Sequence, residues 1–106
     1  MSQTLKIVQA AVARGEVLIS DHAYDRIVEN DIVAQEIADG VRTAMLVEDY
    51  PDYHKGPSTL VLQRDRNNKP IHVVWGLRKG TSSPPVIITA YRPDPQLWTD
   101  DFRRRR

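Results

Sequence analysis

The chain has 106 residues, 41% of them hydrophobic, and a formal net charge of +1. This length supports one compact core and is too short for two, so a single domain over residues 1–106 is expected. The absence of cysteine excludes disulfides, thiolate metal sites and a cysteine nucleophile, and no apolar run approaches the roughly 20 residues that span a bilayer. Because the N-terminus also lacks a secretory signal pattern, we expect a cytoplasmic protein that makes no membrane contact.

Three helices are predicted in the first part of the chain. Apolar residues recur at helical spacing between residues 4 and 14, and Gly15 is a residue type that commonly ends a helix. Residues 16–20 then form a short extended segment, after which Ser20 or Asp21 caps a helix that runs to about residue 29. Asp31 is expected to cap a third helix whose apolar face includes Ile37, and Gly40 should weaken this helix without ending it.

The rest of the chain is predicted to be mainly strands. Extended patterns cover residues 44–50, 59–64, 71–78 and 86–92, with turn-forming residues between them. Residues 65–70 and 79–85 are short enough to join antiparallel neighbours. The predicted fold class is therefore α+β, with the N-terminal helices packed on one face of a twisted antiparallel sheet.

Charge is unevenly distributed between the two halves of the chain. Residues 1–50 carry a net charge of −5 and residues 51–106 a net charge of +6, of which four positive charges are the arginines at 103–106. Such a cluster attracts polyphosphate through counterion release, but a solvated, disordered end would explain it equally well. The tail therefore leaves both interpretations open.

His72 lies in an apolar strand whose two faces differ. Alternation places Ile71, Val73, Trp75 and Leu77 on the face expected to be core, and His72, Val74, Gly76 and Arg78 on the other. The second face thus combines a titratable histidine, a glycine that leaves space above the strand, and the positive charge of an arginine. In the last strand, either Tyr91 or Arg92 must share this face. A buried histidine bonded to a backbone carbonyl is the alternative that involves no chemistry.

The second helix carries another possible functional pair. His22 and Arg26 are four residues apart and therefore share one helix face. In the first helical turn, unpaired N–H groups and the helix dipole favour anions and lower the pKa of a histidine, so a neutral imidazole could act as a base. Arg26 offers a planar fork of donors that suits two phosphate oxygens. The alternative is a surface turn in which Asp21 or Asp25 simply pairs with one of them.

A resemblance to the DUF4258 family rests on four motifs. They are Ile19-Ser20-x-His22-Ala23-x-x-Arg26, Pro70-Ile71-His72-Val73-Val74 and Ile87-Ile88-Thr89-x-Tyr91-x-Pro93, together with Asp31-Ile32-Val33-x-x-Glu36-Ile37. The match covers roughly residues 17–95 and is most specific in the pairing of the His-Ala-x-x-Arg helix with the Thr-x-Tyr-x-Pro strand. Members of that family resemble RelE and barnase-like toxins of bacterial toxin–antitoxin pairs, which place helices before a curved antiparallel sheet.

The resemblance implies a toxin that acts as an RNA endonuclease. Because the residues offer no recognised metal-ligand spacing, we expect this activity to be metal-independent. Its partners would be RNA, in some cases on the ribosome, and a cognate antitoxin, which in some pairs is a zinc-finger protein. The implied catalytic positions are His22, Arg26, His72 and Tyr91. Cleavage would use the 2′-hydroxyl as nucleophile, with the two histidines as acid and base and the arginine on the phosphate. The basic residues that we expect to bind substrate are Arg78, Lys79 and Arg92.

Two other functions fit the same sequence. A non-catalytic RNA-binding module would use the basic second half as an electrostatic surface, with Tyr91 or Trp98 for stacking. A protein-interaction domain would dock a partner through Trp98 and Phe102. No cofactor is expected, and no metal site is predicted, because three scattered histidines without cysteines offer no recognised ligand spacing. His54 is expected in an exposed loop.

Overall fold

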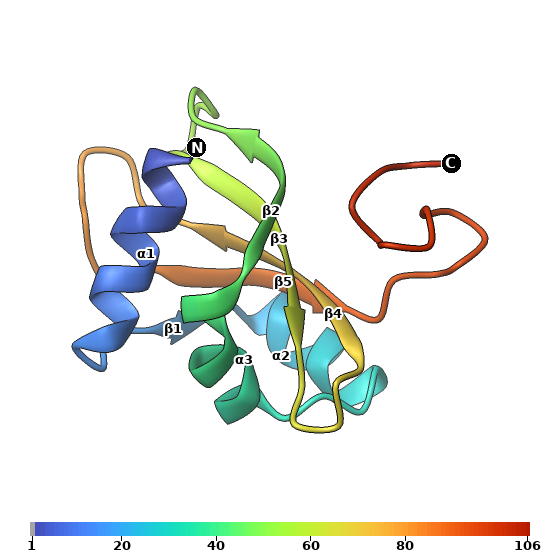
Figure 1. Ribbon diagram of the computed structural model, residues 1–106. Coiled ribbons are helices and arrows are strands. Elements are labelled where there is room, and N and C mark those ends of the chain that lie inside the picture. Colours follow the sequence, from blue (N-terminus) through green and yellow to red (C-terminus); the bar gives the residue numbers. More distant parts are fainter. Residues whose placement is uncertain (1) are drawn as a thin grey trace.

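The computed structural model describes residues 2–106, and its architecture is that of an α+β fold (Figure 1). The helices are α1 (Gln3–Ala13), α2 (Asp21–Glu29) and α3 (Ala34–Gly40), the last followed by a 3₁₀ turn, η1 (Val41–Thr43). The strands are β1 (Leu18–Ile19), β2 (Met45–Tyr50), β3 (Ser58–Arg64), β4 (Pro70–Gly76) and β5 (Val86–Tyr91). They form one sheet in the order β1-β5-β4-β3-β2.

The sheet is mixed because its first edge strand is parallel to its neighbour. The pairs β2–β3, β3–β4 and β4–β5 are antiparallel, as predicted, whereas β1 pairs with β5 in parallel. The expectation of a purely antiparallel sheet was therefore wrong at this edge. The reason is topological: β1 comes from the N-terminal part of the chain and meets β5, which lies almost 70 residues later, through the hydrogen bond from Leu18 N to Pro85 O, 2.9 Å long.

Side-chain caps fix where the first two helices begin. The Ser2 hydroxyl accepts a hydrogen bond from Leu5 N, and the Ser20 hydroxyl accepts one from Ala23 N, each 3.0 Å long. Asp31 does not cap α3, contrary to the prediction. It has a positive φ of 56° and the helix starts three residues later, at Ala34, without a side-chain cap. Gly40 is the last residue of α3, and the chain continues from there as η1.

The main core lies between the three helices and one face of the sheet. It contains the strand residues that alternation assigned to it and the inward residues of the helices. Its members include Leu5, Val8, Ala23, Ile27, Ile37, Val61, Ile71, Val73, Trp75, Leu77, Ile87 and Ala90. A buried polar bridge crosses this core: the Gln63 amide accepts from Trp75 Nε1 at 2.9 Å and donates to the Ile37 carbonyl at 2.8 Å. The predicted packing of the helices on one face is thus confirmed.

The opposite side of the sheet, which we call the open face, is partly covered by residues 93–106, the C-terminal arm. Figure 1 shows this arm leaving β5 and turning back beside the sheet, on the side away from α1. Antiparallel partners point to the same side of a sheet, so the open face carries the side chains that pair with or alternate with His72. They include Glu48, Tyr50, Leu60, Leu62, His72, Val74 and Tyr91. Of these residues, Leu60, Leu62 and His72 are buried and form a second, smaller cluster.

Candidate active site on the open face of the sheet

His72 lies at the centre of the open face and is completely buried. On β4 it stands opposite Leu62 of β3 and Tyr91 of β5, which settles that Tyr91, and not Arg92, shares its face. Both ring nitrogens have partners: Nε2 lies 2.7 Å from the Phe102 carbonyl oxygen and Nδ1 lies 3.3 Å from the Tyr91 hydroxyl. A carbonyl can only accept, so Nε2 carries the proton, and Tyr91 donates to Nδ1 of the neutral ring.

The C-terminal arm is what buries His72. Its end is folded back on itself, with Thr99 N donating to the Arg104 carbonyl at 2.8 Å and Arg106 N to the Leu97 carbonyl at 2.9 Å. This arrangement places the indole of Trp98 against the imidazole of His72, edge to face, with ring centroids 4.4 Å apart. Trp98 is itself buried. The arginine tail is therefore part of the fold, because it closes over the open face and carries Phe102 onto His72.

A carboxylate and a guanidinium lie beside this histidine. Glu48 of β2 accepts from Arg105 Nε at 3.2 Å and Nη2 at 3.1 Å, and the Tyr50 hydroxyl donates to the same carboxylate. The Arg105 guanidinium also stands over the Trp98 ring, 4.7 Å from its centroid. A cation–π contact and a bidentate ion pair thus hold the arm against β2.

The electrostatics of the cluster favour a neutral imidazole between the Tyr91 hydroxyl and the Phe102 carbonyl. Burial lowers the pKa of His72, an effect that the positive charge of Arg105 reinforces and that the Phe102 bond and Glu48 oppose. Burial also raises the pKa of Tyr91, so its hydroxyl keeps its proton. Hydrogen bonds from Arg105 and Tyr50 lower the pKa of Glu48. At neutral pH the site therefore combines a proton acceptor, a hydroxyl donor and an ion pair.

The helical pair predicted from sequence lies apart from this cluster. His22 is in the first turn of α2 and is exposed, as is Arg26, which pairs with Glu29 at 3.3 Å. The residues of α2 that point inward, Ala23 and Ile27, belong to the core on the helical side of the sheet. Among residues 2–106, no hydrogen bond or ion pair joins His22 or Arg26 to His72 or Tyr91.

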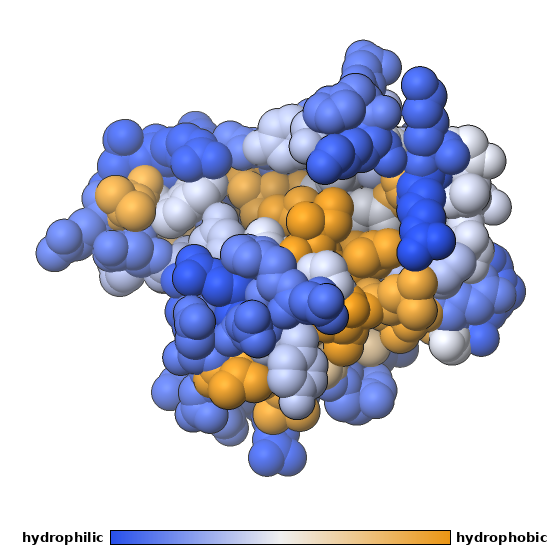
Figure 2. Space-filling view, turned by 180° about the vertical axis from the view of Figure 1, so that it is seen from behind, coloured by the Kyte–Doolittle hydropathy of each residue, from blue (hydrophilic) through white to orange (hydrophobic). Residues whose placement is uncertain are grey.

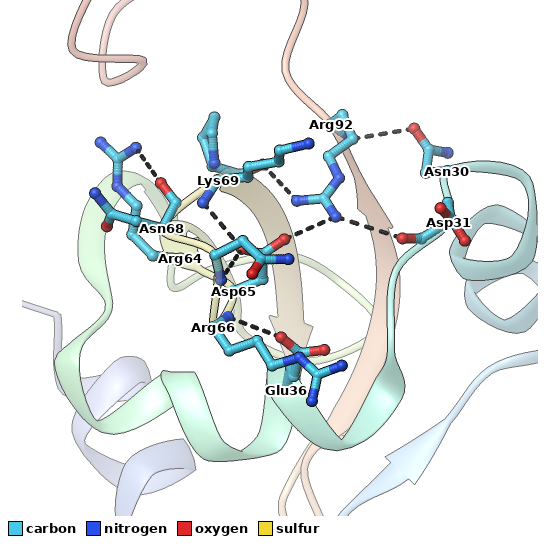
Figure 3. Close-up of polar contacts among 11 residues, drawn as sticks. Asn30, Asp31, Glu36, Arg64, Asp65, Arg66, Asn68, Lys69 and Arg92 are labelled. Atoms are coloured by element: carbon cyan, nitrogen blue, oxygen red, sulfur yellow. Dashed lines mark hydrogen bonds and ion pairs between the residues drawn. The ribbon is translucent and has the colours of Figure 1, made fainter.

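Arg92, predicted to bind substrate, is engaged in the structure of the chain. Figure 3 shows its guanidinium between the β3–β4 turn and the end of α2. It pairs with Asp65 at 2.9 Å and donates to the carbonyls of Pro70 at 3.2 Å and Asp31 at 3.4 Å. Its backbone N–H donates to the Asn30 side chain at 3.1 Å. This arrangement ties two connections to the end of β5 and leaves the guanidinium little capacity for a phosphate.

The other predicted basic residues lie at the far end of the open face. Arg78 and Lys79 follow β4 and are exposed, and Lys79 N bonds the Lys55 carbonyl at 3.2 Å. His54 is in the exposed loop between β2 and β3, as expected, with its ring 4.6 Å from that of Tyr53. The gap expected at Gly76 is filled, because a Cβ there would lie 2.5 Å from Cδ1 of Ile88.

Sequence reasoning missed Glu48, Tyr50 and Arg105. The alternation in β2 is interrupted by a bulge between Leu46 and Glu48, so a strict period of two does not show which residues accompany His72. Arg105 lies more than 30 residues from His72 in the sequence, and only the return of the arm brings it close. The aromatic residues Trp98 and Phe102 were the one signal in the sequence that the arm packs against another part of the protein.

The described part of the chain has neither a cluster of metal-binding side chains nor a membrane-spanning helix. Within residues 2–106, no three His, Asp or Glu side chains gather where they could hold a metal ion. None of the helices in that range has the length and apolar character needed to cross a membrane.

Comparison with known proteins gave one match. No curated protein and no solved structure matched the chain. The family described as Domain of unknown function (DUF4258) matches residues 19–92, a span that begins at the end of β1 and ends just after β5. It therefore includes His22, Arg26, His72 and Tyr91 but excludes α1 and the C-terminal arm. Since this span is well over half of the sequence, the chain belongs to the DUF4258 family.

Proposed function

We propose that the chain is a metal-independent RNA endonuclease whose acid–base chemistry centres on His72, and that it is the toxin of a bacterial toxin–antitoxin pair. The observation that supports this most is a neutral imidazole held between the Tyr91 hydroxyl and a carbonyl oxygen, with Glu48, Tyr50 and Arg105 around it. The carbonyl of Phe102 occupies the position that a hydroxyl or phosphoryl oxygen of RNA would take.

The proposed reaction uses the ribose as an internal nucleophile. Once the Phe102 carbonyl has left, neutral His72 takes the tautomer in which Nδ1–H donates to the Tyr91 oxygen and Nε2 is unprotonated. Nε2 then accepts the proton of the 2′-hydroxyl while the 2′-oxygen attacks phosphorus and the bond from phosphorus to the 5′-oxygen breaks. Tyr91, with its raised pKa, keeps a proton that it can donate to the departing 5′-oxygen. The products are a 2′,3′-cyclic phosphate and a 5′-hydroxyl. Arg103, Arg104 or Arg106 of the tail would stabilise the charge on the phosphoryl oxygens.

This chemistry requires the C-terminal arm to move. His72 is inaccessible while Phe102 and Trp98 cover it. The arm is joined to β5 through residues 93–95, which include two prolines. It is held by Trp98, by the bond between His72 and the Phe102 carbonyl, and by the Arg105–Glu48 ion pair, in which the Arg105 side chain is 65% exposed. RNA would have to displace it, and an antitoxin could hold it in place. Cytoplasmic activity is part of the same proposal.

The test is RNA cleavage in EDTA by the wild type and by His72→Gln. Each proton-transfer group contributes roughly 10²–10⁴-fold to rate, so His72→Gln should slow cleavage by at least about 100-fold. Tyr91→Phe should slow it while leaving the ring contact with His72 in place. Arg105→Ala should accelerate it, because the arm loses its ion pair. A cyclic phosphate detected by mass spectrometry identifies the proposed step.

Two exposed histidines make the test discriminating. His54→Ala, on the loop between β2 and β3, should leave cleavage unchanged, since His54 is placed in no part of the site. His22→Ala decides whether the helical pair takes part: a loss comparable to that of His72→Gln would assign His22 as the second proton-transfer group. Circular dichroism of each variant shows whether the fold persists. No cleavage by either the wild type or Arg105→Ala would overturn the proposal.

One observation favours a second candidate, a non-catalytic binding domain. Complete burial of His72, with both ring nitrogens bonded, is also what a structural histidine shows. RNA binding that weakens steeply with salt, in the absence of cleavage, would support a binding module. Absence of RNA binding at low salt would support a protein-interaction domain.

A further inference from the structure

A hollow at the far end of the open face lies outside the proposed catalytic cluster. Leu18 and Ile88, at the β1–β5 edge, form its apolar floor, and its lining also includes Tyr53, Lys55 and Arg78. The hollow is open to solvent and has a volume of about 460 Å³. Gly76, which also lines it, is four residues from His72 on β4, roughly 13 Å along the strand.

The floor of this hollow is an exposed apolar surface. Leu18 and Ile88 are 42% and 38% exposed, respectively, although they lie on neighbouring strands of the sheet. Figure 2 shows a hydrophobic patch in the middle of the molecule, bounded above and below by hydrophilic segments. Contiguous apolar patches on a small protein commonly mark interaction sites.

The charged groups around the floor are of one sign. Lys55 and Arg78 line the hollow, and the described residues that line it include no aspartate or glutamate. No ion pair among residues 2–106 involves Lys55 or Arg78. A partner that places carboxylates beside aliphatic side chains would therefore match both features.

Two other occupants fit the hollow less well. A second copy of this chain, joined about a two-fold axis through the same patch, would bring two sets of the same cations together. A nucleobase is usually recognised by aromatic stacking and hydrogen bonds to its edges, whereas this floor is aliphatic and the lining offers one aromatic ring, that of Tyr53. We infer that the hollow docks an acidic segment of a partner protein through one or two aliphatic side chains flanked by carboxylates.

The experiment is a titration followed by backbone amide chemical shifts. The probe is a blocked tetrapeptide of two leucines flanked by glutamates, used at millimolar concentration with the full-length protein. We expect saturable shifts at Ile19, Gly56, Gly76 and Ile88. Peptides with lysines in place of the glutamates, or serines in place of the leucines, should produce shifts at least about tenfold smaller at the same concentration.

Matched charge variants show whether the basic rim is responsible. Lys55→Glu combined with Arg78→Glu should weaken binding of the acidic peptide at least about tenfold. Lys6→Glu combined with Arg66→Glu makes the same change of charge at exposed positions on α1 and the β3–β4 turn, and should leave binding unchanged. All four positions are exposed, so neither variant is expected to unfold.

Several results would overturn the inference. One is equal binding of the lysine-flanked peptide, and another is absence of shifts at these four amides. Tighter binding of the dinucleotide UpU at the same amides would assign the hollow to RNA, and shifts there that depend on protein concentration alone would assign it to a second copy. Because the readout is binding and not cleavage, failure of the endonuclease proposal would leave this inference intact.

Discussion

At the residue scale, His72 shows how burial sets the protonation of a group before any chemistry is considered. A charged imidazole would have to be desolvated by Trp98 and the strands around it, and the Phe102 carbonyl offsets this cost only in part. The ring is therefore held in its neutral form. The same property that makes it a possible base makes the fold sensitive to acid.

Because the pKa of His72 is lowered in the folded state, its protonation destabilises the fold. Below the unfolded pKa of about 6.5 the unfolded chain binds a proton that the native state does not, so the free energy of unfolding should decrease as the pH falls from about 6.5 toward the lowered folded pKa. Urea unfolding at several pH values measures this slope. His72→Gln should flatten it, whereas His54→Gln, in an exposed loop, should not.

Arg92 illustrates a second residue-scale effect: one guanidinium holds the β3–β4 turn and the segment after α2 against the end of β5. Asp65 is nearly buried, 7% exposed, and it accepts bonds from Asn67 N and Lys69 N as well as from Arg92. Burial raises the pKa of Asp65, and these bonds together lower it by more. The carboxylate is thus stabilised in its charged form within the turn that Figure 3 shows.

Removing this charge should destabilise the fold. Asp65→Asn is expected to decrease the free energy of unfolding by about 1–3 kcal/mol at neutral pH, since Arg92 keeps its position but loses its counter-ion. The difference from wild type should shrink as the pH falls through the lowered pKa of Asp65, where the wild-type carboxyl also becomes neutral. Asp100→Asn is the control and should change stability little, because Asp100 is a fully exposed carboxylate that pairs with Arg106.

At the scale of elements, the loop between β2 and β3 is locked to the end of β4. Leu77 N donates to the Pro57 carbonyl at 3.0 Å, and Lys79 N to the Lys55 carbonyl. The close approach depends on Gly56, which has a φ of +125° and where a Cβ would overlap the carbonyl oxygen of Leu77. Only glycine satisfies both conditions. The loop thereby forms one wall of the hollow.

Gly56→Ala should therefore be much more destabilising than alanine at another glycine of positive φ. Gly80 has a φ of +80° with open space around it, so Gly80→Ala should cost about 1–2 kcal/mol for the backbone conformation alone. Gly56→Ala should cost about 1–3 kcal/mol beyond that, because the loop must also shift. Denaturant unfolding of the two variants compares them, and equal losses would contradict the role given to the overlap.

At the scale of the whole molecule, the sheet has two buried sides of unequal size. The helical side holds most of the apolar residues, whereas the open face holds Leu60, Leu62 and His72 beneath the arm. The arm is attached at one end only, and few apolar side chains of its own anchor it. Segments of this kind open at a lower free energy than the core.

Hydrogen exchange can measure this difference in the wild type. The amides of Thr99 and Arg106, which are bonded within the arm, should exchange through a local opening at least about 1.4 kcal/mol below global unfolding, whereas Val73 of β4 should exchange only by global unfolding. Arg105→Ala should speed exchange of the arm amides. The free energy of exchange at Val73 should still equal the free energy of global unfolding of the variant. Equal protection of arm and β4 would mean that the arm cannot open independently.

The sequence by itself determined the helices, the four main strands and the core side of β4, because periodic burial and capping are local properties that residues such as Ser20 and Val73 display directly. It also indicated the family through motifs that include His72 and Tyr91. Only the tertiary structure decided that β1 joins β5 in parallel, that Arg92 pairs with Asp65, and that Glu48 and Arg105 meet beside His72. These facts depend on contacts between residues far apart in the chain, which are set by the packing of whole elements and have no period that a sequence can reveal.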